Sequence, residues 1–599
     1  MAEYSAPVRD LKFVIKELGN LSAVGTLPGC DEVTPDLVDA VLEEASKFAA
    51  GVLSPINASG DDSGCKLQDG VVTTPPGFKD AYKQFMEGGW PALSGDPQFG
   101  GQGLPHLIAH SVSEIWNGAN MSFCLGPMLT SGAVNAIARH GTEEQQRLYL
   151  PKLVSGEWMG TMNLTEPQAG SDLSAVRARA VPLGDGRYRV YGTKIFITYG
   201  EHDWGSNIIH LVLARLPDAP EGVKGISLFL VPKFIANPDG SIGARNDVRC
   251  VSIEHKLGIH ASPTCVMAYG DKEGAIGTLV GGENRGLEHM FTMMNFARLE
   301  VGIEGIAVAE RAYQRALAYA RERVQGREIG VKAGERVTII HHPDVRRMLM
   351  SMKAQVEAMR ALAAAASTAL DISHRHPDRD ERSRHQGLVD LLTPVVKGWC
   401  TESGIEIASL GVQVHGGMGY VEETGAAQHL RDARITTIYE GTTGIQAMDL
   451  VGRKIAAEKG MTAKALIAHM RAFDKELSGA SSHPALSVIR RALSDGVNGL
   501  AEATDWIIET YPHNPRAAAA GAVPYLKLWG VVAGGWQMAR AALVAKGQLD
   551  AGSEDFAFYR AKLGTARFFA EHILPQASAY KAAIVNGSAS VLALDEAQF

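Results

Sequence analysis

Residues 438–443 read Ile-Tyr-Glu-Gly-Thr-Thr, and this short segment follows Leu-Arg-Asp-Ala-Arg at 430–434. A glutamate between an aromatic residue and a Gly-Thr turn can lie on a loop at the end of a helix, partly shielded from water, where its carboxylate acts as a base. Taken alone, the pattern has little specificity, because a Glu before a Gly is usually a solvated turn residue. Glu440 is therefore a candidate base whose assignment depends on the rest of the chain.

The region before this segment is predicted to be a helical bundle that begins near Gly286. Two long apolar stripes at helical spacing support this prediction. The Arg-, Asp- and His-rich stretch between the stripes, 374–385, is interpreted as an exposed turn between helices rather than a metal site. The stripes consist of Val345, Met348, Leu349, Met352, Val356, Met359 and Leu362, and of Leu388, Leu391, Leu392, Val395 and Trp399.

Further toward the N-terminus the hydrophobic period changes from helical to strand-like. From Thr165 to about Gly281, short runs rich in β-formers are separated by Gly, Pro, Asn and Asp. These runs predict a compact antiparallel barrel or sandwich. They lie at 188–192, 194–198, 208–213 and 226–231.

Both ends of the chain are predicted to be helical, with Thr142 as an N-cap in the first half. The expected fold class is mainly α with a central β domain. The prediction comprises an N-terminal helical domain (1–160), a middle antiparallel β-barrel (161–282), a C-terminal four-helix bundle with the candidate base (283–456) and an additional helical domain (457–599).

The composition is typical of an ordinary soluble protein, with 46% apolar and 21% charged residues in a chain of 599. The formal charge of −8 argues against nucleic acid as the main partner. Six cysteines without a CxxC pair indicate reduced thiols, and no metal site is expected. The N-terminus shows neither a signal nor a transit pattern, and no uninterrupted apolar run reaches the ~18 residues that span a bilayer. We therefore expect a cytoplasmic enzyme without stable membrane insertion.

Six motifs in a fixed order strengthen the interpretation of Glu440 as a base. Together they resemble the acyl-CoA dehydrogenase family over roughly residues 35 to 455, whereas each motif alone is weakly specific. The motifs are Leu-Thr-Glu-Pro-Gln-Ala-Gly-Ser-Asp at 164–172, Gly-Thr-Lys-Ile-Phe-Ile-Thr at 192–198, Arg298, Arg-Glu-Arg-Val-Gln-Gly at 321–326, Gln-Val-His-Gly-Gly-Met-Gly-Tyr at 413–420, and 438–443.

The resemblance implies flavin adenine dinucleotide (FAD) as the cofactor. Thr165, with Met162 and Leu164 beside it, would bind the pyrimidine edge of the flavin. Phe196, where many relatives have Trp, would cover one face of the ring, and Thr198 would reach toward N5. Taken alone, the pattern favours an inward-facing strand residue for Phe196 and a simple β-former for Thr198.

The resemblance also implies how the rest of the cofactor is held. Arg323 would pair with the pyrophosphate from a neighbouring subunit, which predicts a homodimer with a shared site, although a solvated arginine fits the same pattern. Gln413 and the backbone of Gly416 and Gly417 would lie along the dinucleotide. Because Gly-Gly-Met-Gly does not follow a strand, a nicotinamide-binding fold is rejected.

Thr442 would contact the same cofactor beyond the base. Many relatives have Gln where Gly444 stands, so the contact of that Gln with the neighbouring cofactor is in doubt.

Four residues are substrate-side candidates by resemblance. Ser171 would contact the pantetheine region, but it also reads as an N-cap in competition with Asp172. Asn295 stands where many relatives have Asp. Arg298 would place a supporting charge near the catalytic loop, or act as a structural ion-pair partner, and Gly441 lies beside the base.

The activity that the resemblance implies is α,β-dehydrogenation of an acyl-CoA thioester. Glu440 would remove the α-proton, a hydride would pass to flavin N5, and the product would be a trans-2-enoyl-CoA. Electrons would then pass to an electron-transferring flavoprotein. Some relatives place the base at the position of Ala297, which cannot serve, so Glu440 remains.

The helical tail beyond Glu440 resembles the long bacterial subgroup of the family and favours a dimer. Members of that subgroup act on fatty acyl-CoA or 3-methylthiopropanoyl-CoA, and the sequence leaves both substrates open. Two other functions remain as alternatives: an acyl-CoA oxidase that uses oxygen, and a non-catalytic flavoprotein relative that binds nucleic acid.

Overall fold

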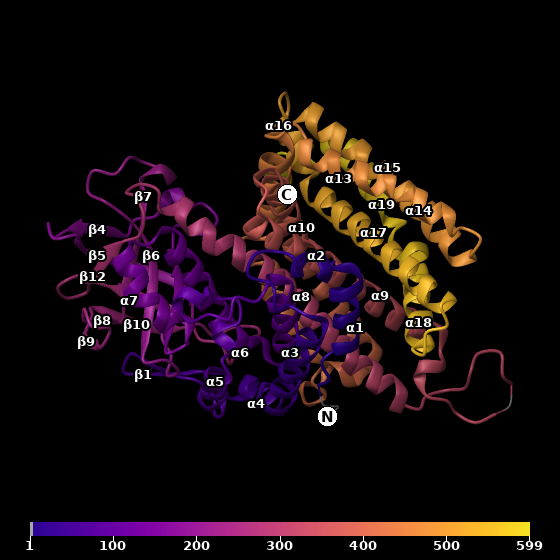
Figure 1. Cartoon of the computed structure of the whole chain (residues 1–599), viewed down its shortest axis with the longest axis horizontal. Helices are drawn as coiled ribbons and strands as arrows, with labels where there is room; N and C mark the ends of the chain where they lie inside the picture. The colour runs from indigo at the N-terminus through magenta and orange to yellow at the C-terminus, as the bar shows by residue number, and fades with distance from the viewer. Residues whose placement is uncertain (1–3, 333) are drawn as a thin grey trace. The chain divides into compact units, whose positions relative to one another are not determined.

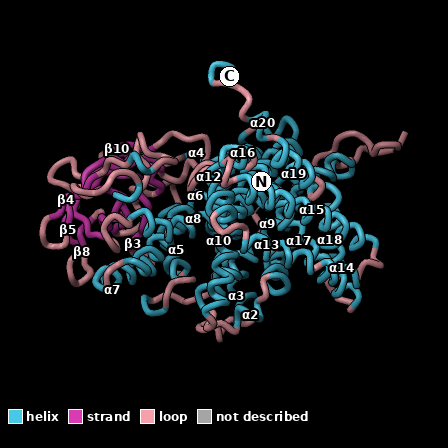
Figure 2. Tube along the Cα trace, turned by 90° about the horizontal axis from the view of Figure 1, so that it is seen from above, coloured by secondary structure: helices cyan, strands magenta, loops and turns pink. Residues whose placement is uncertain are grey.

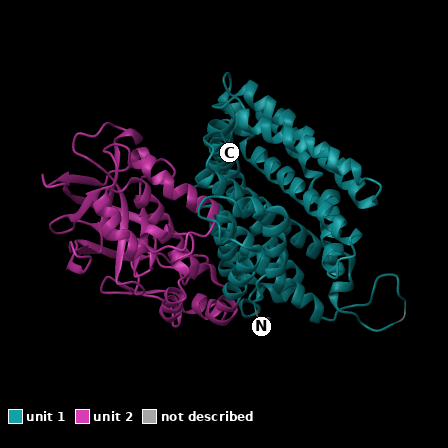
Figure 3. Cartoon of the chain, in the orientation of Figure 1, with its two compact units in different colours: residues 1–46, 106–118, 301–599 teal, residues 47–105, 119–300 magenta. Residues whose placement is uncertain are grey.

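The computed structural model describes residues 4–332 and 334–599. This part of the chain is mainly helical with one β region, as predicted, and Figure 2 shows the labelled strands gathered in that region. The chain divides into two compact units (Figure 3). Unit 1 holds the chain up to Ser46, His106–Gly118 and Val301–Phe599, and unit 2 holds Lys47–Pro105 and Ala119–Glu300.

The centre of unit 2 is an eight-stranded sheet with the order β10-β11-β5-β12-β7-β6-β3. Strand β4 lies beside both β5 and β6, so that β5, β12, β7, β6 and β4 close into a ring. The strands are β3 Trp158–Asn163, β4 Arg179–Pro182, β5 Arg187–Thr198, β6 Asn207–Arg215, β7 Ile226–Pro232, β10 Val248–Ile253, β11 Thr264–Tyr269 and β12 Ala275–Leu279.

The pairing in this sheet differs in one respect from the antiparallel prediction. Strand β3 runs parallel to β6 along its whole length, and β4 meets β6 through one parallel pair. Strands β6 and β7 are almost continuously buried, which is typical of strands covered on both faces. Their runs of Val, Ile, Leu and Phe therefore form the core of unit 2.

Helix α7 (Glu143–Val154) packs on this core and begins at the predicted N-cap. The Thr142 hydroxyl accepts a hydrogen bond from the Gln145 N–H at 3.2 Å, and the Gln145 side chain accepts from the Thr142 N–H at 3.0 Å. This reciprocal capping box satisfies two backbone donors at the helix start and confirms the prediction.

Unit 1 contains the predicted bundle, built on three long helices: α8 (Gly286–Glu322, which starts in unit 2), α9 (Pro343–Arg375) and α10 (Arg379–His415) (Figure 1). The predicted apolar stripes on α9 and α10 are largely buried. The turn between these helices is much shorter than the predicted 374–385, because Asp378 caps α10 by accepting from the N–H groups of Asp380 and Glu381.

The tail beyond residue 460 is helical, as predicted, and its central helix α17 packs on α9 and α10. A Cβ on Gly530 of α17 would lie 2.1 Å from the Trp399 side chain of α10, so the close approach requires glycine. The main tail helices are α13 Met461–Ala472, α15 Pro484–Thr510, α17 Ala522–Asp550, α18 Phe556–Phe568 and α19 Gln576–Asn586.

One long helix, α6 (His106–His140), is apolar enough over 18 residues to cross a membrane by length and composition. However, 72% of that window is buried inside the structure, and the helix is interrupted by non-helical backbone at Asn120. The burial identifies it as a core helix. Within the described residues the six cysteines are free, and no group of three His, Cys, Asp or Glu is placed to hold a metal.

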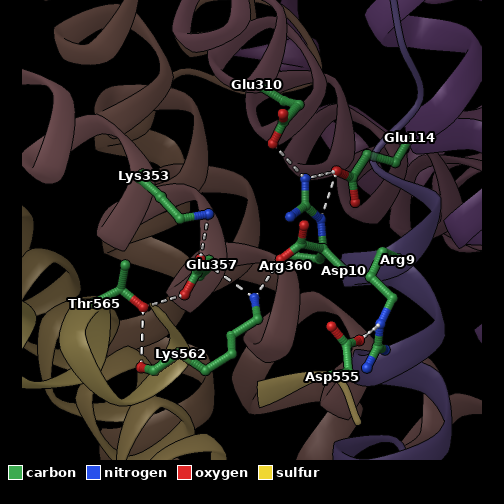
Figure 4. A network of polar contacts seen from close by, with 10 residues as sticks. All are labelled: Arg9, Asp10, Glu114, Glu310, Lys353, Glu357, Arg360, Asp555, Lys562 and Thr565. Atoms are coloured by element: carbon green, nitrogen blue, oxygen red, sulfur yellow. Dashed lines mark hydrogen bonds and ion pairs between the residues drawn. The ribbon is translucent and has the colours of Figure 1, made fainter. Parts of the chain in front are cut away.

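A buried network of charges joins the N-terminus, the bundle and the tail within unit 1 (Figure 4). Arg360 on α9 binds Glu114 of α6 at 2.5 Å and Glu310 of α8 at 2.8 Å. Lys562 on α18 pairs with Asp10 of α1 (Val8–Phe13) and with Glu357 of α9. All of these residues are buried except Asp10, which is half-buried, and the buried charges depend on their partners for compensation.

Burial acts to raise the pKa of Asp10, but the Lys562 ammonium, helped by Arg360 and Lys353, outweighs it and lowers the pKa to about 2. The ordinary value is 3.8, so the folded state favours the ionised carboxylate. The stabilisation from this pair is complete above the ordinary pKa and is lost as the pH falls toward the folded value.

We predict that Lys562→Met lowers the free energy of unfolding by about 3–5 kcal/mol, because it removes the buried cation that pairs with both Asp10 and Glu357. Chemical denaturation at pH 7 measures the loss, and the difference from wild type should shrink as the pH falls below 4 and toward 2. The matched control is Lys581→Met, whose partly exposed pair with Glu502 contributes at most about 1 kcal/mol. Equal effects of the two changes would contradict the prediction.

Candidate active site

In unit 2, the segment after β3 is anchored on strand β5. The Lys194 ammonium of β5 donates to the carbonyl of Leu164 at 3.0 Å and to the Glu166 carboxylate at 2.8 Å. The Ile195 N–H donates to the carbonyl of Thr165 at 2.9 Å. Thr165 is therefore held on both sides, half-buried, next to the buried Met162 at the end of β3.

Lys194 and Glu166 form a buried ion pair that the sequence analysis did not single out. Burial lowers the pKa of Lys194 to about 8, although Glu166 opposes the shift. Burial acts to raise the pKa of Glu166, but Lys194 and the N–H groups of Arg177 and Ala178 lower it. Both groups remain charged at neutral pH. The available signal was a lysine within a predicted strand whose neighbours are apolar.

Phe196 adopts an unusual conformation on β5. Its φ is +58°, and its side chain is 59% exposed although it lies in a central strand. The register of β11 on β5 shifts between Cys265 and Met267, so two residues of β5 oppose one of β11. This bulge turns the Phe196 ring outward, and the alternative of an inward-facing strand residue is wrong.

The neighbouring candidates in unit 2 take separate positions. Thr198 is half-buried, and its carbonyl accepts from the Thr161 hydroxyl at 2.7 Å. Ser171 is exposed, and it is Asp172 that caps the following turn by accepting from the Ser174 N–H. The N-cap alternative for Ser171 is therefore wrong, and its side chain remains available to a ligand.

Asn295 and Arg298 lie one turn apart on α8, at the end of unit 2. Asn295 is exposed, and Arg298 is buried. The Arg298 guanidinium lies 3.5 Å from the Asn295 side-chain oxygen and 5.7 Å from the centre of the Phe291 ring. Ala297 between them is buried and carries no titratable group.

In unit 1, helix α10 ends in an open glycine loop. Gly416 has φ +60°, which requires glycine, and a Cβ on Gly416 or Gly417 would meet no atom within 4 Å. Gln413 is exposed on the last turn of the helix. A flat or extended ligand can therefore approach this backbone closely.

Arg323 follows directly after the last residue of α8 and is exposed. Beyond it, Val324 and Thr338 pair with each other, and the described residues between them, 325–332 and 334–337, form a largely exposed arm. The arm carries exposed apolar residues, among them Ile329 at 79% and Val331 at 46%.

The loop with Glu440 lies between a short helical turn, Arg434–Thr437, and helix α12 (Thr443–Met448). Glu440 is half-buried with φ +54°, and Gly441 follows with φ +91°. The Gln446 amide of α12 donates to the carbonyls of both residues, at 3.1 and 3.3 Å. Thr442 caps α12 by accepting from the Ile445 N–H.

Two buried ionisable residues outside the predicted motifs, Lys397 and Glu304, support this loop. The Lys397 ammonium of α10 donates to the carbonyls of Thr436 at 2.8 Å and Gly441 at 2.7 Å. The Tyr439 hydroxyl donates to the carboxylate of Glu304 on α8. Burial, together with Glu304 and Glu440, raises the pKa of Tyr439 well above its usual value. Lys397 is the one charged residue in the run 394–400, whose other members are apolar or glycine, and this was the signal available in the sequence.

Comparison with known proteins settles the family. The chain is 49% identical over 589 residues to the 3-methylmercaptopropionyl-CoA dehydrogenase of Ruegeria pomeroyi, covering 98% of this chain and 99% of that protein. The chain belongs to the acyl-CoA dehydrogenase family. Four family models match in order: the acyl-CoA dehydrogenase N-terminal domain at 37–157, the middle domain at 161–271, the C-terminal domain at 284–455, and an acetyl-CoA dehydrogenase C-terminal-like model at 465–595.

Two further comparisons extend over most of the chain. A broad-specificity linear acyl-CoA dehydrogenase of Mycobacterium tuberculosis is 36% identical over 100% of both chains. The crystal structure of an acyl-CoA dehydrogenase from Bacillus anthracis, complexed with FAD, superposes with a TM-score of 0.72 at 18% identity, covering 92% of this chain and 88% of that one. At this identity, the structural similarity shows that the two proteins share a fold.

The protein is thus an FAD-dependent acyl-CoA dehydrogenase, which converts an acyl-CoA thioester to its 2-enoyl product. Each unit, taken by itself, offers residues that fit part of a flavin dinucleotide. Phe196 offers an outward aromatic face, and Gly416 and Gly417 offer open backbone. A bound flavin would explain why an apolar ring faces outward from a central strand.

We predict that Lys194→Met lowers the FAD content of the purified protein and destabilises it by about 3–5 kcal/mol, because Glu166 becomes a buried charge without its partner. The ratio of flavin to protein absorbance and the unfolding midpoint measure both effects. Lys194→Met/Glu166→Gln removes the unpaired charge and should recover part of the stability. Full flavin content in Lys194→Met would show that the pair does not support the segment around Thr165.

Proposed function

We propose that Glu440 is the base that removes the α-proton of the acyl-CoA thioester. The observation that carries this assignment is the left-handed backbone of Glu440, with φ +54°, on a loop held by side chains from other helices. A non-glycine residue in this conformation costs of order 1–3 kcal/mol and persists where the surroundings impose it, as at catalytic sites. The half-buried carboxylate loses further water when substrate binds, which raises its pKa toward working pH.

The remaining candidates have supporting roles in this proposal. Met162, Leu164, Thr165, Phe196 and Thr198 hold and orient the flavin ring. FAD, when bound, accepts the hydride from the substrate. The backbone N–H of Glu440 binds the thioester carbonyl oxygen, where a donor stabilises the negative charge that develops as the proton leaves. The dinucleotide part of the cofactor is contacted by Gln413, Gly416, Gly417 and Thr442. The substrate is contacted by Ser171, Asn295, Arg298 and Gly441.

We predict that Glu440→Gln retains FAD but loses about 10²- to 10⁴-fold in turnover, the usual contribution of a general base. Dye reduction with acyl-CoA measures turnover, and flavin absorbance confirms the cofactor. The matched control is Glu423→Gln, a change at an exposed glutamate that should leave the rate unchanged. An active Glu440→Gln enzyme would remove Glu440 as the base.

For the substrate, we propose 3-methylthiopropanoyl-CoA over fatty acyl-CoA. The support is the name and the 49% identity of the Ruegeria relative, against 36% for the broad-specificity linear acyl-CoA enzyme. Bleaching of the flavin absorbance and kcat/KM across a series of acyl-CoA thioesters test this. We predict the highest kcat/KM with 3-methylthiopropanoyl-CoA, and a maximum at octanoyl-CoA or longer would favour the fatty acyl substrate instead.

For partners, we propose a homodimer in which Arg323 reaches the pyrophosphate of the neighbouring subunit's cofactor. The exposed arm after Arg323, with its apolar residues, supports a subunit contact. We further propose an electron-transferring flavoprotein as the electron acceptor and no nucleic-acid partner. Absence of peroxide during turnover would separate this enzyme from an oxidase.

The shared site predicts complementation between two inactive variants. Arg323→Ala should weaken FAD binding, because a charge-assisted contact is lost. When Arg323→Ala and Glu440→Gln subunits are mixed and reassembled, each mixed dimer has one site with both native residues, which is about a quarter of all sites. Recovery of activity on mixing supports the shared site, and no recovery in dimers shown to be mixed contradicts it.

We also propose that the chain is organised into domains at 1–160, 161–282, 283–456 and 457–599, with a barrel in the second and a four-helix bundle in the third. The order of the four family models supports this division. A cytoplasmic location is proposed as well, because the six cysteines, all free in the part of the chain that the structure describes, suit a reducing compartment.

A further inference from the structure

The loop around Glu440 is bridged by one buried ammonium group. Lys397 is fully buried on α10, and its Nζ atom donates to carbonyls on both sides of Glu440, four residues before it at Thr436 and one residue after it at Gly441. The two distances, 2.8 and 2.7 Å, are those of charge-assisted hydrogen bonds. The bridge therefore sets the separation of the two loop ends.

A second contact holds the loop between these ends. Tyr439, the residue before Glu440, donates its hydroxyl proton in a hydrogen bond to Glu304, which is 1% exposed on α8. The two anchors come from different helices, α8 and α10, and both belong to unit 1. The direction of the Glu440 side chain is consequently set by two long helices rather than by the loop itself.

The backbone conformation of Glu440 requires the support of these two contacts. A left-handed conformation at a non-glycine residue is unfavourable, so an unrestrained loop would relax from it. Relaxation of one φ/ψ pair swings the carboxylate away from its position. Proton abstraction is sensitive to such displacement, since about 1 Å of misplacement can cost 10²-fold in rate.

We propose that Lys397 and Glu304 are positioning residues for the base, with Lys397 acting through the Thr436 and Gly441 carbonyls and Glu304 acting through Tyr439. The inference rests on the assignment of Glu440 as the base. Neither residue belongs to the six motifs or contacts the reacting atoms in this scheme. Their loss should reduce the chemical step more than substrate binding.

The test uses the holoenzyme with Lys397→Met, Glu304→Gln and Tyr439→Phe, each of similar volume to the native residue. We expect kcat to fall about 10- to 100-fold, with FAD content retained and KM within about threefold of wild type. The deuterium isotope effect on kcat, measured with α-deuterated 3-methylthiopropanoyl-CoA, should rise, because proton abstraction becomes more rate-limiting. A role in folding alone would not change the isotope effect.

Two internal controls sharpen the result. Tyr439→Phe/Glu304→Gln should be no slower than the worse single variant, because both changes break one contact. Lys464→Met removes a surface lysine paired with Asp505 and should leave kcat unchanged. If Lys397→Met does not fold, Lys397→Arg, which keeps the charge but alters the geometry of both hydrogen bonds, takes its place with the same expected fall in kcat.

The outcomes separate the two proposals. Wild-type kcat and isotope effect in Tyr439→Phe, Glu304→Gln and the Lys397 variant would overturn the positioning inference, even if Glu440→Gln is inactive. A rise in KM with unchanged kcat would overturn it as well, since it would assign the residues to binding. An active Glu440→Gln enzyme would overturn the proposed base itself.

Discussion

The buried positive charge of Arg360 constrains the whole of unit 1. It is neutralised by Glu114 of α6 and Glu310 of α8. Helices α6, α8 and α9 therefore cannot slide past one another without leaving an unpaired charge in an apolar interior. The register of α8 then places Glu304, six residues before Glu310, against Tyr439. The position of the loop with Glu440 is thus derived from an ion pair that lies outside that loop.

Unit 2 uses the same principle on a smaller scale. Lys194 and Glu166 pair inside the sheet and fix the chain on both sides of Thr165. In each unit a buried lysine, Lys194 or Lys397, donates to backbone carbonyls of the segment that carries the proposed chemistry. A buried ammonium is a demanding anchor, because all its hydrogen bonds must be made by the protein, and it therefore defines the geometry of the segment closely.

The residues with the strongest functional assignment are also those that depart from local preference. Phe196 and Glu440 both have positive φ, an uncommon state for bulky side chains, and both lie in regions that match acyl-CoA dehydrogenase domain models. An ordinary strand residue at the position of Phe196 would point inward. The positive φ of Phe196 explains why its ring points outward instead. Strain at these positions is sustained by the contacts around them, and in the proposed mechanism the activity depends on the resulting orientation.

Much of this protein follows from local sequence. The apolar stripes of α9 and α10, the capping box at Thr142 and the order of the motifs determined the helices, the family and the cofactor, because periodicity and motif spacing involve residues close in the chain. Tertiary structure alone decided the parallel pairing of β3, the ring closed by β4, and the partners of Lys397 and Glu304. These contacts join residues up to 135 positions apart, and their formation depends on how the whole chain is packed rather than on any local pattern.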